Sequence, residues 1–235
     1  MTRARFSFNT PTAKFALVLL VIIILSLLPH YHEIYAGAEV SPALVVHGAL
    51  YLIWYVLFAV QAGLVAAGNM RLHRMLGLTS LGLMGLLVWS GLDMLIGVMA
   101  SYQPDWDPAF HVSRASFVWA ITHTLICFCL FYGVGIGYRT RPAVHRRFMM
   151  LAALSMISAS VTRFAYLPFM PIDGTALTLL MTYGLLIAAL VVDRVQHGQV
   201  HAVLKWGVPS YAVTQILALG ALPSTDLGLA LAFPF

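Results

Sequence analysis

The sequence predicts an all-α integral membrane protein, folded as a single transmembrane domain over residues 1–235. Hydrophobic residues make up 61% of the chain and charged residues 9%, whereas soluble domains carry about 25% charged residues. Seven stretches hold almost no charge. Their lengths are close to the about 20 residues that a helix needs to cross a hydrocarbon core of about 30 Å. We therefore expect a bundle of seven transmembrane helices in a lipid bilayer. The net charge of +5 then reflects basic turns at the membrane surface, and it does not indicate a nucleic-acid partner.

The first predicted helix covers about residues 14–28. Its charge pattern is also that of a signal peptide, but the small-residue triplet at 36–38 lies well beyond the apolar run. We therefore expect a retained transmembrane helix, which ends before Pro29. The second helix covers about 42–67, with Pro42 in the first turn, where proline is favoured. The third helix ends near residue 99, the fourth covers about 114–137, and the fifth, sixth and seventh end near residues 167, 192 and 222.

The basic residues lie in alternate turns. The N-terminus and the turns after the second, fourth and sixth helices hold 11 of the 13 Lys and Arg residues. The segments after the first, third and fifth helices hold none except Arg114 at a helix boundary. Because basic residues gather on the cytoplasmic side, the N-terminus is expected in the cytoplasm. The C-terminus is expected in the periplasm, for a multi-pass protein of the bacterial inner membrane.

Two consecutive helix pairs, about residues 42–99 and 114–167, carry polar residues in the same order. Each pair has a histidine on its first helix, a second histidine in a basic turn, and one charge within its second helix. We interpret this order as an internal duplication of helices two and three as helices four and five. The residues are His47, His73 and Asp93 in the first copy and His123, His145 and Arg163 in the second.

Asp93 and Arg163 are expected to form a buried ion pair. Measured from the basic turns, their heights in the membrane differ by only ~4–5 Å at ~1.5 Å per residue. A single charge within a transmembrane helix costs ~2.5–3.5 kcal/mol on insertion scales, so the two charges should meet. The pair is either a clamp between the third and fifth helices or one wall of a polar pocket with Thr122, His123 and Tyr166.

Histidines near both faces of four consecutive helices resemble the dihaem b-type transmembrane cytochromes. In that family the second and fourth helices hold one haem, and the third and fifth hold the other. The resemblance implies that His47 and His123 ligate an outer haem b and that His73 and His145 ligate an inner one. It also implies electron transfer with a quinone or a redox partner protein. The chain departs from the pattern because His73 and His145 lie at helix starts and because His47 and His123 differ in depth by roughly 12 Å.

Two other functions fit the same residues. A haem-free structural or assembly subunit of a membrane complex would need only the ion pair, and a small-molecule or metal carrier could line a pathway with the histidines. The patterns H-x2-L-x3-W (47–54) and L-H-R-x2-G (72–77) also resemble a family of predicted bacterial inner-membrane proteins, which implies the architecture alone. The sequence holds no phosphate-binding glycine loop, CxxC, nucleophile elbow or HExxH motif. Catalytic residues are therefore not predicted, and whether the protein is an enzyme is left open.

Overall fold

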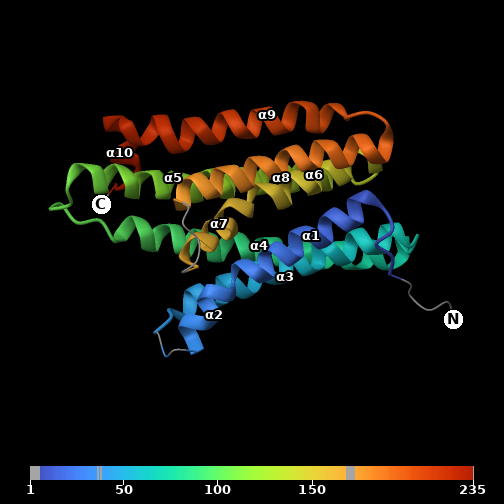
Figure 1. The fold of residues 1–235 in the computed structure, drawn as a ribbon, viewed down its shortest axis with the longest axis horizontal. Helices are drawn as coiled ribbons and strands as arrows, with labels where there is room; N and C mark the ends of the chain where they lie inside the picture. Colours follow the sequence, from blue (N-terminus) through green and yellow to red (C-terminus); the bar gives the residue numbers. More distant parts are fainter. Residues whose placement is uncertain (1–5, 36, 38, 168–172, 235) are drawn as a thin grey trace.

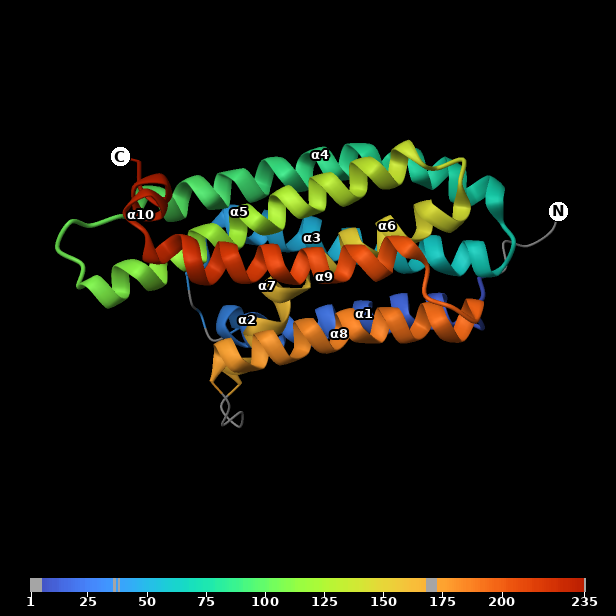
Figure 2. The ribbon, with the colours of Figure 1, turned by 90° about the horizontal axis from the view of Figure 1, so that it is seen from above.

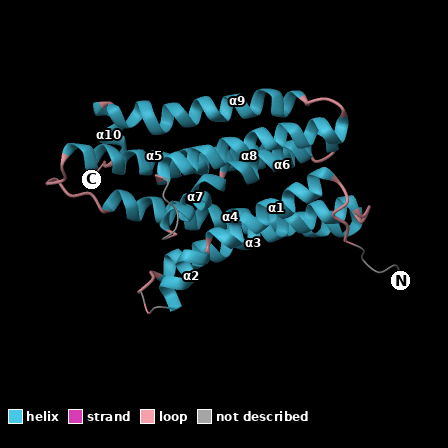
Figure 3. Cartoon of the chain, in the orientation of Figure 1, coloured by secondary structure: helices cyan, strands magenta, loops and turns pink. Residues whose placement is uncertain are grey.

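The protein is a bundle of long helices aligned along one axis (Figure 1). The structure is a computed structural model that describes residues 6–35, 37, 39–167 and 173–234. Helices and loops account for all of these residues, with no strand among them (Figure 3). The all-α fold class predicted from composition and apolar runs is therefore confirmed.

The helices follow one another in the expected order, with two interruptions. The chain starts with α1 (Pro11–Ser26), α2 (Leu28–Tyr35), α3 (Pro42–Ala66), α4 (Met70–Ala100) and α5 (Pro108–Gly137). The next span is divided into α6 (Pro142–Ser155), α7 (Ile157–Val161) and the 3-10 helix η1 (Thr162–Tyr166). The chain then forms α8 (Gly174–His197), α9 (Ala202–Ile216), the π-helical turn η2 (Leu217–Ala221), the 3-10 turn η3 (Leu222–Ser224) and α10 (Asp226–Ala232).

Capping residues explain where the long helices begin. Ser41 precedes Pro42 and accepts a hydrogen bond from the Leu44 amide at the start of α3. Asp107 precedes Pro108 and caps α5 in the same way. A polar N-cap residue satisfies an amide that has no partner within the helix, and proline in the first turn sacrifices no hydrogen bond. The start of α3 at Pro42 agrees with the prediction, whereas α5 begins at Pro108, six residues before the predicted start near residue 114.

Five helices are long and apolar enough to cross a membrane: α3, α4, α5, the span from Pro142 to Ala165, and α8. A sixth span is formed if α9 through η3 is counted together with α10, which bends away by 98°. The remaining apolar helix, α1, has only 16 residues, a length of ~24 Å. The structure thus supports five to six candidate spans where seven were predicted, because α1 is short for a membrane span and the last run bends.

The turns that carry most of the basic residues lie together at one end of the bundle. We call this the basic end, and it comprises the start of α1 and the turns α3–α4, α5–α6 and α8–α9 (Figure 1). The loop between α4 and α5 and the C-terminal α10 lie at the opposite end. The alternation predicted from the basic residues therefore matches the path of the chain.

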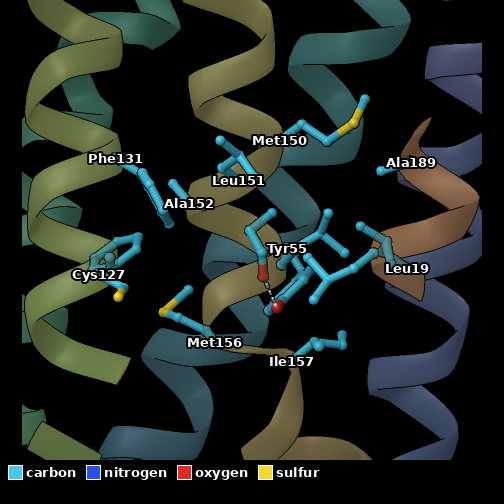
Figure 4. Close-up of a cluster of buried hydrophobic side chains, with 14 of the residues drawn as sticks. Leu19, Tyr55, Cys127, Phe131, Met150, Leu151, Ala152, Met156, Ile157 and Ala189 are labelled. Atoms are coloured by element: carbon cyan, nitrogen blue, oxygen red, sulfur yellow. Dashed lines mark hydrogen bonds between the residues drawn. The ribbon is translucent and has the colours of Figure 1, made fainter. Parts of the chain in front are cut away.

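The broken span that contains α6 is at the centre of the bundle. Seen from above, α4 and α5 lie on one side and α1 and α8 on the other (Figure 2). In the span that contains α6, 56% of the apolar 18-residue segment is buried inside the protein, whereas the corresponding share is 17–33% in the other four spans. Leu151 and Ile157 pack there among side chains of α1, α3, α5 and α8 (Figure 4). The outward faces of the other helices expose large apolar side chains, as expected for a lipid environment.

The two predicted repeat units differ in their second helices. α4 runs unbroken for 31 residues, whereas α6 stops after 14 residues and the chain continues as α7 and η1. The duplication is therefore not confirmed as an equivalence of two helix pairs. What the units share is the placement of one histidine at the start of the second helix.

Candidate functional site

The structure brings together the two histidines of the basic turns. His73 is the fourth residue of α4 and His145 is the fourth residue of α6, so both side chains lie at the same depth. Their ring centroids are 6.3 Å apart, and the ring planes are inclined by 74°. We call His73 and His145 the inner histidine pair.

Hydrogen bonds orient one of these rings. The Nδ1 atom of His145 lies 2.7 Å from the carbonyl oxygen of Gly135. A carbonyl can only accept, so Nδ1 carries the hydrogen and the unprotonated nitrogen of the neutral ring is Nε2. Histidines that bind a metal usually donate a hydrogen bond from one ring nitrogen to a group such as a backbone carbonyl. The other ring nitrogen then keeps its lone pair for the metal. The Nδ1 atom of His73 is buried and has no hydrogen-bond partner among the described residues.

The turns that hold the inner histidine pair also hold arginines without acidic partners. Arg74 donates to the carbonyl oxygen of Met70, and Arg139 donates to that of Ile136. The Arg146 Nε atom is buried with no partner among the described residues. None of these guanidinium groups forms an ion pair with a described carboxylate. The basic end can therefore accept negative charge next to the histidines.

The outer histidines, by contrast, are held by different helices. The Nδ1 atom of His47 on α3 forms a hydrogen bond with the hydroxyl of Ser90 on α4, 3.0 Å away. The Nε2 atom of His123 on α5 forms a hydrogen bond with the hydroxyl of Thr214 on α9, also at 3.0 Å. No ring contact joins the two among the described residues. The structure therefore does not bring the predicted outer haem ligands together, because they face opposite neighbours.

Asp93 and Arg163 also lie apart. Asp93 is exposed on α4, which packs mainly against α3 and α5. Arg163 lies in η1, where it donates a hydrogen bond to the carbonyl oxygen of Ala159. Asp193 is the acid of both ion pairs found among the described side chains. The predicted Asp93–Arg163 pair is not formed, since η1 and the Asp93 face of α4 are on different sides of the bundle.

A small polar cavity lies beside Arg163. It has a volume of about 40 Å³, and its polar lining consists of His47, Tyr51, Ser160 and Arg163. Such a cavity needs about 10–15 Å³ to hold one water, so this one can hold a few waters and is too small for a macrocycle. Of the residues predicted to share a pocket with Arg163, His123 lies elsewhere, and the side chain of Tyr166 is outside the described part of the chain.

Sequence reasoning missed the interruption of the central span. α6 ends at Ser155, and Met156 separates it from α7. The hydroxyl of Tyr55 donates to the carbonyl oxygen of Ala153 at 2.6 Å, and that of Tyr51 donates to the carbonyl oxygen of Met156 at 2.7 Å. A third tyrosine, Tyr211 of α9, donates to Ser155 at 3.2 Å. Carbonyls beside a break in a membrane helix need such partners because lipid offers none.

Replacing Tyr55 with phenylalanine should therefore lower the free energy of unfolding by about 0.6–2 kcal/mol, the range for hydrogen bonds between membrane helices. The measurement is unfolding of the purified protein in detergent with increasing SDS. Tyr183→Phe is the matched control, because the Tyr183 hydroxyl is buried without a partner in the described structure. Equal effects of the two changes would show that the hydroxyl of Tyr55 does not stabilise the break.

A buried ion pair at the basic end was also missed. The Nε atom of Arg147 lies 2.9 and 3.0 Å from the two carboxylate oxygens of Asp193, and Nη2 lies 2.6 Å from one of them. Both side chains are 4% exposed. Asp193 also accepts from the His201 amide at 2.8 Å. The pair thus joins α6 and α8 to the first residue before α9.

The comparisons with known proteins identify no relative. No family model matches the chain, and no curated protein or solved structure is significantly similar to it. The resemblance to predicted inner-membrane proteins is therefore not shown. The candidate site rests on its geometry.

Proposed function

We propose that this chain is a membrane electron-transfer protein that binds one haem b between His73 and His145. The observation that carries the proposal is the 6.3 Å between the two ring centroids. Two nitrogens that share one metal ion at about 2.0–2.1 Å each lie about 4 Å apart, and the ring centroids must lie somewhat further apart. The spacing of the inner histidine pair is compatible with this requirement, so His73 of α4 and His145 of α6 would each hold the haem iron through one imidazole nitrogen.

The choice of a haem over a bare metal ion rests on the number of ligands. No group of three or more His, Cys, Asp or Glu side chains converges in the described part of the chain. Structural and catalytic zinc sites take three or four protein ligands, which the inner histidine pair does not provide. Haem iron needs only axial ligands from the protein. The arginines of the same turns, which form no ion pair with a described carboxylate, would neutralise the two haem carboxylates.

Haem supplies a one-electron carrier, and the residues of this chain would position it and set its surroundings. The Gly135 carbonyl would keep the lone pair of His145 directed at the iron. A quinone or a redox protein is the proposed partner. An open apolar groove of about 330 Å³ between α3 and α4, lined by Val60, Thr79 and Leu83 among others, suits the apolar tail of a quinone.

The experiment is an absorption spectrum of the full chain purified from haem-replete cells, recorded oxidised and then reduced with dithionite. We expect a Soret band and an α-band that change on reduction, with one haem per chain by extraction. Protein without these bands, from cells that load a control b-type cytochrome, would overturn the proposal.

A second candidate, a small-molecule carrier, is favoured by the interruption between α6 and α7. Transporters bind solutes where membrane helices are broken, and the cavity with His47 and Arg163 adjoins this break. A folded, haem-free protein would shift the assignment toward this function.

The proposed location is a bacterial inner membrane with the basic end in the cytoplasm, since basic turns are retained on that side. A phosphatase reporter fused after Arg141 should be inactive, and one fused near Asp105 should be active. The opposite pattern would reverse the orientation, and activity at both sites would contradict the span between them.

A further inference from the structure

We propose that the exposed face of α4 binds a transmembrane helix of a partner protein that carries a lysine or arginine. α4 is the least buried of the five candidate spans, with 17% of its apolar 18-residue segment buried inside the protein. Its face away from α3 and α5 presents residues spaced three or four apart, which places them on one stripe of a helix. These residues are Leu78, Gly82, Leu86, Trp89, Asp93 and Ile96.

The stripe is open along its length. Leu78, Trp89 and Ile96 are 71%, 61% and 57% exposed. A Cβ atom added to Gly82 would meet nothing within 4 Å, so another helix can approach the backbone closely there. Small residues at such positions are typical of contacts between membrane helices.

Asp93 places an ionisable side chain on this otherwise apolar face, which lipid chains alone would not favour. The residue lies 19 positions after Arg74 and nine before Tyr102, or ~28 Å and ~13 Å along the helix. A membrane is about 40–45 Å thick with its headgroups, so the carboxylate falls within the outer part of the hydrocarbon. It is exposed there and makes no hydrogen bond or ion pair within the described structure. Ionisable residues at such depths are costly and are usually paired.

The charge selects the kind of partner. Two copies of this chain in one membrane would share their orientation and meet around an axis along the membrane normal. Their Asp93 carboxylates would then face each other at the same depth, and like charges repel. A helix with a basic residue at that depth removes the unpaired charge instead. This inference does not depend on haem, because Asp93 lies toward the end opposite the inner histidine pair.

The test uses the full chain in phosphatidylcholine vesicles and synthetic leucine-alanine helices as probes. One probe carries a single lysine at the depth of Asp93, and the other carries leucine there. By energy transfer, the lysine probe should bind about tenfold more tightly. Asp93→Asn should abolish this difference and keep the fold, since the carboxylate has no partner to lose. Equal binding of the two probes to the unmodified chain would overturn the proposal.

A matched pair of glycine variants locates the binding face. Gly82→Leu should weaken binding of the lysine probe about tenfold by blocking the close approach. Gly184→Leu is the control, because Gly184 is an exposed glycine with equally open surroundings on α8. Equal loss in both variants would contradict the assignment to α4. Energy transfer between two labelled copies that rises with Asp93→Asn would identify a second copy as the occupant and overturn the proposed partner.

Discussion

Alanine at His73 or at His145 is expected to remove nearly all of the Soret absorbance per chain. In the proposed site each histidine would hold the haem from a different helix, and a haem held through one histidine at the edge of the bundle should be lost during purification. His47→Ala and His123→Ala should leave the spectrum in place, because their rings bind Ser90 and Thr214. The absorbance of the four variants, normalised to protein, is the measurement.

Imidazole rescue separates ligation from folding. His145→Gly leaves a gap of the size of the ring, and added imidazole should restore the bands if the side chain serves only as a ligand. A spectrum that survives His73→Ala and His145→Ala unchanged would reject the inner histidine pair as ligands. Partial loss of the bands in each of the four variants, with one centre lost for the pair His47 and His123 and another for the pair His73 and His145, would instead support the dihaem arrangement that the sequence resemblance implied.

The inner histidine pair was predictable because the start of a helix is determined by residues next to it in the sequence. Asn69 caps α4 through the Leu72 amide, and Pro142 occupies the first turn of α6. These signals place His73 and His145 at the same position of two neighbouring helices. The outer histidines have no helix start next to them that would fix their position. His47 and His123 lie within long helices, where the direction of a side chain depends on how the helix is rotated in the bundle.

The errors at the candidate site concern contacts between distant helices. The central span has neither proline nor glycine at its break, so Ser155 and Met156 carry no local signal of it. The break is stabilised by tyrosines of α3 and α9. Depth alone suggested that Asp93 and Arg163 would pair, but depth does not fix the face of a helix. Arg147 lies in a basic turn, and its partner Asp193 lies 46 residues later, so no local pattern indicates the ion pair.

Asp193→Asn is expected to destabilise the protein by about 3–5 kcal/mol, the usual result of removing one partner from a buried ion pair. The change leaves the Arg147 guanidinium buried at 4% exposure without a counter-charge. It also weakens the acceptor of the His201 amide, which holds the start of α9 against α8. The separate variant Arg147→Lys should also lower the stability, since lysine cannot reproduce the contact of the guanidinium with both carboxylate oxygens. Unfolding in SDS, followed by circular dichroism, measures both variants.

The double variant Arg147→Met with Asp193→Leu distinguishes a charge effect from a packing effect. Buried ion pairs replaced by apolar residues of similar volume are often as stable as the original, so the double variant should regain most of the loss. Arg194→Gln is the matched control, because Arg194 is exposed one residue further along α8 and should change stability by no more than about 0.5 kcal/mol. If Asp193→Asn is no more harmful than Arg194→Gln, the pair does not hold the basic end together. If the double variant is as unstable as the single ones, the hydrogen bond to His201 carries more of the stability than the ion pair.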